Sequence, residues 1–591
     1  MDANQHNRYE WLQVALVVIF SLVSVGRIVS TYKVFNQTWD EPVHVASGME
    51  WLQQGTYTYE HLHPPLARVA MAIGPYLHEI RLRDSDLHPQ VLVAGGNAIF
   101  AAHGEYLHNL SLARLGVLPF FLLGIGVVFY WTRKLVGGWA AVAAVGLFTT
   151  LPPILGHAGL ATTDLPFTAT FVLALVAFTI WVEKPTTARS VMFGFAVGLA
   201  LMSKFSALLF LPACGAAVVF CWLFSGELTS LKWWQEIPIR LKPLVLAALL
   251  CLAIIFACYR FSFHPVTGSV DRPHLSLDHL FGQQGKWHDL SYKLVENVPV
   301  PVPEFLHGIQ QARGRVNDAG KMYLLGQVRT SGWWYFFPVA LGVKTPIAFL
   351  ILVLVGALGI IKFWKRDKHN WEVLVPLVAA AALLLVCLPT KLNIGLRHIL
   401  PIYPLLSIVA GIGFVELWNR ERVRWLGRTL AIGLAAWMLI SVSMAHPDYL
   451  AYFNEFAGDH PERILVDSDL DWGQDALRLS SALHARGVDH VSIAYNGSAD
   501  LNQMNLPAFE VLAPCVHTSG WIAISLYTLQ MSKPSIGCGG YSWLEGYKPV
   551  TLVGKSIRLY WIPGPGETSV PANTFGMQKS TLPRTAQQPA I

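Results

Sequence analysis

Long apolar stretches recur through the first three-quarters of this 591-residue chain, and they limit what it can fold into. Hydrophobic residues make up 53% of the sequence and charged residues 14%, whereas an ordinary soluble domain carries about 25% charge. A stretch of about 20 apolar residues can cross the hydrocarbon core of a bilayer as a helix. The sequence therefore predicts an α-helical polytopic membrane protein. We expect eleven spans, at residues 11–30, 112–132, 139–156, 165–182, 190–203, 206–224, 243–262, 337–361, 372–389, 399–418 and 428–445.

The fifth and sixth spans could also be one helix, because residues 190–224 are almost continuously apolar. Lys204 lies in the middle of this stretch, and a lysine at the centre of a bilayer is costly. A tight turn at residues 203–206 would bring Lys204 to a membrane surface. We therefore expect the stretch to be divided there into two helices.

Basic residues gather in the short loops that follow every second predicted span. These loops are 133–134, 184–189, 232–242, 362–368 and 420–428. Because cytoplasmic loops are enriched in Lys and Arg, the pattern predicts a cytoplasmic N-terminus in the inner or plasma membrane of the cell. The long loops 31–111 and 263–336, and everything after residue 446, then lie on the extracytoplasmic side. The net charge of +6 is modest and falls in these loops, so we expect no nucleic-acid partner.

The composition changes after residue 445, where polar and apolar residues begin to alternate in short runs. The predicted elements are strands at 464–466, 491–495, 521–526 and 552–561 and a helix at 476–486. They predict a small extracytoplasmic α/β domain over 446–565, followed by a disordered tail over 566–591 that is rich in Pro, Thr and Gln. Cys515 and Cys538 lie in this region and could form a disulfide in an oxidising compartment.

Polar residues from distant segments fall at the extracytoplasmic end of the predicted bundle. A charge at one helix end is common, but ionisable groups at membrane depth are functional candidates, and eight on one face favour a site. The candidates are Asp40, Glu41, His63, Asp164, Lys204, Lys344, Arg397 and His398.

The acidic pair Asp40 and Glu41 follows the first predicted span. Transfer of a group to a hydroxyl needs a carboxylate that accepts the proton, and a carboxylate pair can also hold a divalent cation. Solvation of the membrane interface is the alternative interpretation. Because two successive side chains point in different directions, we expect Asp40 to be the base and Glu41 to orient a partner or a cation. A possible divalent cation is left open.

Lys204 and Arg397 are the cations of this face, and phosphate is an anion that such a pair binds well. Snorkelling at helix ends is the alternative, although the basic bias of the cytoplasmic side makes it less attractive. Asp164 opens a span and could cap it, join the site, or both. His63 precedes two prolines and could contact a substrate or only lead a stiff loop into a helix.

The segment 467–475 (DSDLDWGQD) carries alternating aspartates. Such alternation is typical of a calcium loop, but the glycine comes one place late and no glutamate follows at the right distance. The simpler interpretation is that Asp471 caps a helix and Gln474 completes a capping box.

Taken together, these residues resemble the GT-C class of membrane glycosyltransferases, in particular the protein O-mannosyltransferase and lipid A aminoarabinose transferase group, which depends on phospholipid carriers in bacteria. The resemblance covers about residues 10–445. The matching motifs are Asp40-Glu41, His63-Pro64-Pro65-Leu66, Asp164-Leu165-Pro166, Ser203-Lys204-Phe205-Ser206, Lys344-Thr345-Pro346 and Arg397 to Pro401. The C-terminal region does not resemble the β-trefoils of eukaryotic members, and the segment 467–475 is similar to one in uncharacterised bacterial members.

The resemblance implies a GT-C catalytic domain over residues 1–445 and an enzyme that takes a sugar from a polyprenyl-phosphate-linked donor. It implies that Asp40 deprotonates an acceptor hydroxyl, which attacks the sugar with inversion while Lys204 and Arg397 stabilise the departing lipid phosphate. The remaining candidates would contact the donor. The acceptor, whether protein, lipid or glycan, stays open.

Two alternatives remain at this point. A transporter or flippase of lipid-linked sugars would show paired repeats and charged residues near the middle of the membrane, and the sequence shows no repeat. An oligosaccharyltransferase or ligase would share the fold and differ only in the size of its donor.

Overall fold

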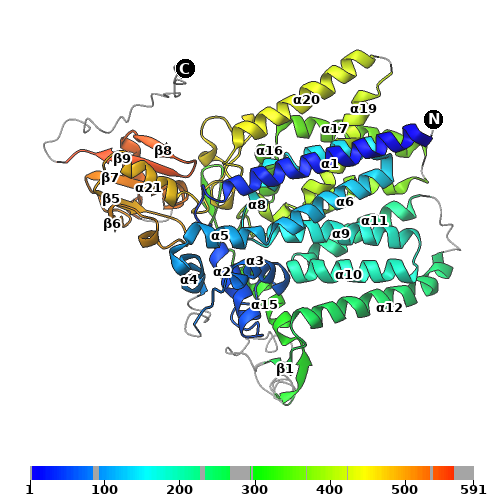
Figure 1. Cartoon of the computed structure of the whole chain (residues 1–591), viewed down its shortest axis with the longest axis horizontal. Helices are drawn as coiled ribbons and strands as arrows, with labels where there is room; N and C mark the ends of the chain where they lie inside the picture. The colour runs from blue at the N-terminus through cyan, green and yellow to red at the C-terminus, as the bar shows by residue number, and fades with distance from the viewer. Residues whose placement is uncertain are drawn as a thin grey trace, which may run out of the picture.

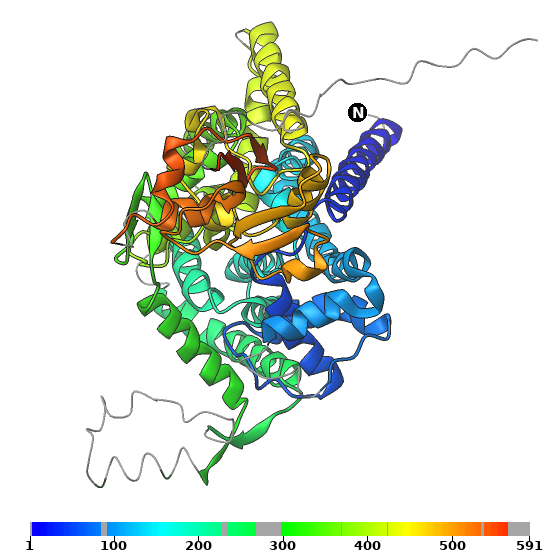
Figure 2. The same cartoon turned by 90° about the vertical axis from the view of Figure 1, so that its left-hand side faces the viewer.

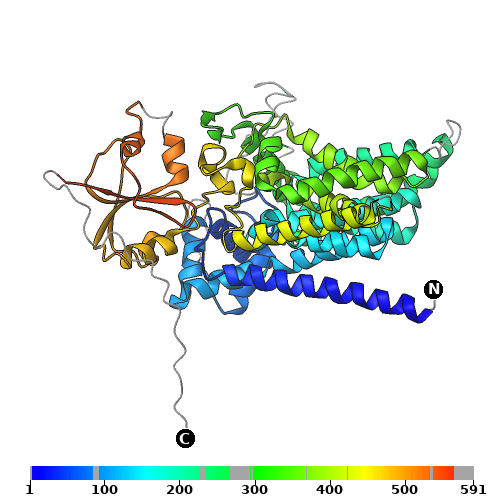
Figure 3. The same ribbon diagram turned by 90° about the horizontal axis from the view of Figure 1, so that it is seen from above.

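Long helices run side by side through most of the chain, and a smaller sheet domain lies beyond one end of this bundle (Figure 1 and Figure 3). The computed structural model describes residues 3–83, 92–225, 233–266, 297–367, 369–421, 423–532 and 537–564, together with Lys286 and Lys293. The bundle helices are α1 (Ala3–Thr31), α6 (Leu118–Val136), α7 (Gly138–Phe148), α8 (Pro152–Ala158), α9 (Asp164–Glu183), α10 (Thr187–Ser203), α11 (Ala207–Leu223), α12 (Trp233–Cys258), α16 (Phe336–Lys344), α17 (Ile347–Arg366), α18 (Val375–Cys387), α19 (Ile402–Trp418) and α20 (Arg424–Ala445).

Every predicted span lies on one or two of these helices. Six helices of the described chain are long and apolar enough to cross a membrane, and the bent pair α7 and α8 gives a seventh span if it is counted as one. Four further apolar helices are shorter, at 10–17 residues. The expectation of an α-helical, multi-pass membrane protein with a small C-terminal α/β domain is confirmed.

Two of the predicted spans are broken at prolines. The span predicted at 337–361 consists of α16 and α17, because Thr345 is extended and the chain restarts its helix only after Pro346. The span predicted at 139–156 bends by 66° between α7 and α8, where the extended Leu151 precedes Pro152.

The break predicted at residues 203–206 is confirmed. Helix α10 ends at Ser203, α11 begins at Ala207, and the backbone of Lys204 between them is extended. Lys204 therefore stands at a helix end and not inside a continuous span.

The two long loops contain short elements that cover the same end of the bundle. The first holds α2 (Glu41–Gln53), α3 (Pro65–Leu77), α4 (Leu92–Ala101) and α5 (Tyr106–Leu115). The second holds the strand pair β1 (Phe263–Pro265) and β2 (Pro299–Pro301), helix α15 (Pro303–Asn317), and the hairpin of β3 (Met322–Leu324) and β4 (Gln327–Arg329).

The C-terminal domain is built on one mixed sheet with the strand order β6-β5-β7-β9-β8. Strand β5 pairs in parallel with β6 and β7, and β9 pairs antiparallel with β7 and β8. The elements are α21 (Ala476–His484), β5 (His490–Ala494), β6 (Ala508–Val511), β7 (Gly520–Ser525), α22 (Leu526–Ser532), β8 (Thr551–Val553) and β9 (Ile557–Ile562). The expected tail over 566–591 lies outside the described residues.

Three details of this domain differ from the expectation. The run predicted as a strand at 464–466 is an irregular segment between two 3₁₀ turns, η8 (Pro461–Arg463) and η9 (Asp467–Asp469). The strand predicted at 552–561 is a hairpin of β8 and β9, and β6 was not predicted. In contrast, the disulfide considered between Cys515 and Cys538 is present.

The N-terminus of α1 and the sheet domain lie at opposite ends of the bundle (Figure 3), and a view from the sheet-domain end shows the sheet in front of the helices (Figure 2). At the end of the bundle where α1 begins, two basic residues of the predicted cytoplasmic loop 133–134 form ion pairs with glutamates of other segments. Arg133 contacts Glu10, and Lys134 contacts both Glu183 and Glu372. The basic loop 133–134 therefore lies close to the residues that border the basic loops 184–189 and 362–368.

Candidate active site

Asp40 lies at the start of α2, where the chain turns back after α1. Its side chain is 26% exposed, and its Oδ2 accepts a hydrogen bond of 2.5 Å from Nη1 of Arg397. Among the described residues this is the only hydrogen bond of the carboxylate, so Oδ1 is open to a ligand.

Arg397 joins Asp40 to a second ion pair. It lies in the short 3₁₀ turn η6 (Leu396–Ile399) before α19, and its Nη1 is 3.9 Å from Oδ2 of Asp164. Asp164, the first residue of α9, accepts a hydrogen bond of 2.6 Å from Nζ of Lys204 through Oδ1. Two carboxylates and two cations from four distant segments thus alternate in one chain of contacts.

The surroundings of Asp40 keep it ionised. Burial raises the pKa of its carboxyl, but the positive charge around it, first that of Arg397, lowers it more, so the pKa ends below its ordinary value of 3.8. His44 lies one helical turn further along α2, and burial followed by the charge of Arg68 lowers its pKa to about 3. Nε of Arg68 donates to Nδ1 of His44 at 3.1 Å, so the proton of this neutral imidazole is on Nε2.

Two nitrogen atoms at the centre of the site are buried and have no hydrogen-bond partner among the described residues. They are Nε of Arg397 and Nε2 of His398. A buried polar group left without a partner costs about 1–3 kcal/mol, so a ligand that bonds to these atoms would recover that energy. Burial also lowers the pKa of His398 well below its ordinary range, which leaves this ring neutral.

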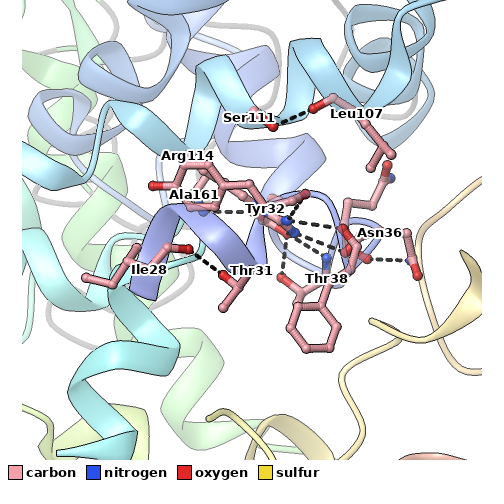
Figure 4. Close-up of polar contacts among 12 residues, drawn as sticks. Ile28, Thr31, Tyr32, Asn36, Thr38, Leu107, Ser111, Arg114 and Ala161 are labelled. Atoms are coloured by element: carbon pink, nitrogen blue, oxygen red, sulfur yellow. Dashed lines mark hydrogen bonds and ion pairs between the residues drawn. The ribbon is translucent and has the colours of Figure 1, made fainter. Parts of the chain in front are cut away.

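Glu41 has surroundings opposite to those of its neighbour. Its carboxylate forms a bidentate pair with Arg114 of α5, with 2.9 Å from Nε to Oε1 and 2.9 Å from Nη2 to Oε2, and both side chains are fully buried. Oε2 also accepts from the backbone N–H of Thr38 at 2.7 Å, and Oε1 from that of Ala161 at 2.8 Å. Figure 4 shows Arg114 between Asn36 of the first loop and Ala161. Glu41 therefore joins three segments and offers no free oxygen within the described chain.

His63 lies beside this group through His44. The two rings meet edge to face with 5.0 Å between their centroids, and Nδ1 of His63 is 3.4 Å from Oγ1 of Thr163, just before α9. The hydroxyl of Tyr57 donates to the carbonyl of His63 at 2.6 Å. Pro64 and Pro65 continue the chain into α3, so the predicted stiff entry to a helix and the approach to the site coexist.

Lys344 is not part of the charge chain. It is the last residue of α16, and its Nζ donates to the carbonyls of Leu450 at 2.8 Å and of Asp469 at 2.5 Å. The ammonium also lies 4.3 Å from the centre of the Phe453 ring. The structure therefore places this candidate where the bundle holds the start of the C-terminal region.

The acidic segment 467–475 folds against the site. The backbone N–H of Trp39 donates to the carbonyl of Trp472 at 3.1 Å, and the Trp472 ring lies over Arg397, 4.3 Å from Cζ to the ring centre. Asp467 lies near the same guanidinium, and burial raises its pKa to about 6 despite that charge. The C-terminal region thus supplies one wall of the site.

The interpretation of Asp471 as a helix cap is wrong. Helix α21 begins at Ala476 behind Asp475, and Oδ2 of Asp471 instead accepts from the Ser525 hydroxyl at 2.5 Å and from the backbone N–H of Tyr527 at 2.8 Å. Asp471 is thus held by protein donors, whereas Asp469 accepts from the backbone N–H of Leu396 through Oδ1 and its Oδ2 has no partner within the described residues. Within the described residues, the group whose side-chain atoms are close enough to share a metal ion lies elsewhere, at His78, Glu105 and His108.

With this geometry described, the chain can be compared with known proteins. Residues 108–233 match the model of a family described as dolichyl-phosphate-mannose-protein mannosyltransferase. This segment of the chain is therefore similar to membrane glycosyltransferases. It includes Asp164 and Lys204 but neither Asp40 nor Arg397.

The chain is also similar to solved structures. One is ArnT from Cupriavidus metallidurans bound to undecaprenyl phosphate, at 14% identity over 93% of this chain and 98% of that chain, with a TM-score of 0.44. Another is the oligosaccharyltransferase of Archaeoglobus fulgidus in its apo form, at 16% identity over 74% of this chain and 55% of that chain, with a TM-score of 0.45. A search of curated protein sequences gave no match.

Sequence reasoning missed two residues of this site, His44 and Trp472. His44 could have been found, because it lies four residues after Asp40 on a segment that reads as a helix start. Trp472 could not, because only the folded chain brings it onto Arg397.

Proposed function

We propose that this chain is a GT-C glycosyltransferase that moves a sugar from a polyprenyl-phosphate donor to an acceptor hydroxyl, with inversion at the sugar. The proposal rests on one observation: three carboxylates lie on the same face of the bundle but differ in burial and in the number of oxygens that are already paired. Glu41 and Asp164 are buried in ion pairs, whereas Asp40 is partly exposed with one oxygen open.

In the proposed step, Oδ1 of Asp40 accepts the proton of the acceptor hydroxyl. The acceptor oxygen forms a bond to the anomeric carbon, and the bond from that carbon to the phosphate oxygen breaks. The lipid phosphate leaves with the electron pair of that bond. A base of this kind contributes about 10²–10⁴-fold to the rate.

The phosphate is proposed to bind where the unpaired donors gather. Nε of Arg397 is buried without a partner, and Nζ of Lys204 uses one of its three donor positions on Asp164. His398 adds a neutral ring whose Nε2 has no partner in the described chain. Charge-assisted bonds to a phosphate are stronger than neutral ones, which suits stabilisation of a leaving group.

Donor binding would also prepare the base. Arg397 is the largest influence that lowers the pKa of Asp40, and a phosphate that bonds to Arg397 would weaken this pairing. The pKa of Asp40 would then rise toward a value at which the carboxylate accepts a proton more readily. The same arginine would link donor occupancy to the strength of the base.

We also propose that the site faces the extracytoplasmic side and that the N-terminus is cytoplasmic. The basic loops that form ion pairs around Lys134 lie at the opposite end of the bundle from the sheet domain, which supports this orientation. The C-terminal domain would then be extracytoplasmic, consistent with the Cys515–Cys538 disulfide.

The test uses purified full-length enzyme in liposomes with a synthetic polyprenyl-phosphate sugar that carries a labelled sugar. The acceptor for this assay is identified beforehand by mass spectrometry, as the envelope glycan, lipid or protein that lacks a sugar in a deletion strain. Asp40→Asn keeps an oxygen for Arg397 but cannot take a proton, so we expect kcat to fall by about 10²–10⁴-fold. The exposed Asp489→Asn serves as the matched control.

Arg397→Lys keeps the positive charge but loses Nε and the planar fork, so we expect a raised KM for the donor. Near-normal turnover by Asp40→Asn would rule out the base. An unchanged donor KM in Arg397→Lys would rule out the phosphate site.

A further inference from the structure

Three metal-binding side chains meet away from the charge chain, at the far end of α3. His78 is the residue that closes α3, Glu105 precedes α5, and His108 lies in the first turn of α5. Their ligand atoms all lie within 4.8 Å of one another. None of the three takes part in the proposed transfer reaction.

The contacts among them are direct. Nε2 of His78 is 3.2 Å from Oε2 of Glu105, and the rings of His78 and His108 have centroids 4.9 Å apart. Glu105 and His108 are three residues apart at a helix start, which places both side chains on one face of α5. His103 adds a third imidazole, 5.7 Å from the His78 ring between centroids.

The donor set selects the kind of metal. Two imidazoles and one carboxylate form a mixed nitrogen and oxygen set, which suits zinc and its neighbours among the divalent transition metals better than calcium or magnesium, whose ligands are oxygen. Three protein ligands leave a coordination position for water or for a fourth side chain.

The surroundings leave room for an ion and its water. An open hollow is lined by the three side chains and by Leu477 of α21 and Gln503 of the C-terminal domain. His78 is at the end of α3, whereas Glu105 and His108 are at the start of α5. An ion bound by all three would therefore link the two helices beside the C-terminal domain.

We propose that His78, Glu105 and His108 bind one divalent ion of the zinc class and thereby clamp the end of α3 to the start of α5. Helix α3 begins directly after His63 and Pro64, so the clamp fixes the far end of the helix that leads away from the candidate active site. The proposal does not depend on the identity of the sugar donor or acceptor.

The test measures zinc on the full-length enzyme in detergent, purified with a tag that contains no histidine and stripped with a chelator. The probe is Zn²⁺ alone, and bound zinc per chain is counted by elemental mass spectrometry after dialysis. We expect one zinc per chain for the wild type. His78→Ala, His108→Ala and Glu105→Gln should each weaken binding by at least tenfold.

The matched control is His484→Ala with His490→Ala, which removes two exposed histidines from the C-terminal domain. This variant should bind zinc like the wild type. Cobalt offers a second readout, because Co²⁺ at the site should give a visible absorption band that His78→Ala abolishes. Size-exclusion profiles of the stripped proteins check that every variant is folded.

Zinc binding that is equal in the wild type and in a folded His78→Ala/His108→Ala variant would overturn the proposal. So would a wild type that retains no zinc after dialysis.

Discussion

At the scale of single residues, Asp40 and Glu41 are neighbouring carboxylates with different partners and different proposed roles. Asp40 precedes the first turn of α2 and turns toward Arg397, whereas Glu41 begins the helix and turns into the core toward Arg114. The adjacent pair alone predicts that one of them is the base, and the structure shows which one is already bound on both oxygens. We therefore leave Glu41 out of the proposed chemistry and assign it to the assembly of the site.

Glu41→Gln tests this assignment. Removing one partner of a fully buried ion pair leaves an uncompensated charge on Arg114, so we expect a loss of about 3–5 kcal/mol of stability. Thermal unfolding in detergent measures the change. Glu183→Gln is the control, because Glu183 is 43% exposed in its pairs with Lys134 and Arg189, and exposed pairs contribute at most about 1 kcal/mol. A Glu41→Gln variant that is as stable as wild type would contradict the assembly role.

The pH dependence of the reaction tests the coupling between Asp40 and Arg397. The base must be ionised, so activity falls as the pH drops through its pKa. In the free enzyme that pKa is lowered, so kcat/KM should hold down to roughly pH 5 and below. In the donor complex the pKa is expected to be higher, so kcat should decline at a higher pH than kcat/KM.

Asp467 needs a control in this experiment, because burial raises its pKa to about 6. The profiles are therefore measured in parallel with Asp467→Asn. If kcat/KM still declines near pH 6 in Asp467→Asn, Asp467 is not the cause of the decline. The catalytic base then has a pKa that is not lowered, which contradicts the assignment of Asp40 as a base held ionised by Arg397.

At the scale of elements, the sequence predicted correctly those helices and breaks that depend on a short stretch of residues. The positions of the spans, the break at Lys204 and the helix after Pro65 follow from apolar length, the cost of a buried lysine and the stiffness of proline. The strand expected at 464–466 failed because three apolar residues cannot distinguish a strand from an irregular buried segment. Leu465 and Val466 are 1% and 2% exposed without a sheet partner.

The candidate site shows the same division. Its charges could be foreseen at one end of the bundle, because helix ends and loop charges are local properties. The order of contacts from Asp40 through Arg397 and Asp164 to Lys204 could not, since it depends on how distant helices pack. For the same reason Lys344 and Lys204 look equivalent in the sequence but have different partners.

Trp472 gives a prediction at this scale. Its ring covers the guanidinium of Arg397, and such a contact contributes about 0.5–2 kcal/mol, so Trp472→Ala should raise the donor KM by roughly 2- to 30-fold. Trp472→Phe keeps a ring and should recover part of the loss. Trp543→Ala, which removes a ring stacked on His517, is the control. Equal donor KM values for all three variants and the wild type would remove Trp472 from the site.

At the scale of the whole molecule, the bundle and the sheet domain meet around the candidate site. Lys344 of the bundle holds the carbonyls of Leu450 and Asp469, and Asn36 of the first loop bonds to the carbonyl of Gly473 at 2.7 Å and to the backbone N–H of Ala476 at 2.7 Å. The C-terminal region therefore contributes to the site and is more than an appended domain.

A reporter fusion tests the proposed orientation of this whole. A reporter placed after Ala445 should read as extracytoplasmic, and one placed in the loop after Arg366 should read as cytoplasmic, because the basic loops lie at the other end of the bundle. Alkaline phosphatase and a fluorescent protein give opposite readouts on the two sides. The reverse result at both positions would invert the topology.

The contact between Trp472 and Arg397 has a consequence for when the enzyme becomes active during its synthesis. The helices that carry Asp40, Asp164 and Lys204 are made and inserted long before the ribosome reaches residue 472. Until that late segment has been made and has folded back onto the bundle, Arg397 lacks its aromatic cover and the first loop lacks its partner at Gly473. We therefore expect a partly made chain to be inserted but inactive until these contacts have formed.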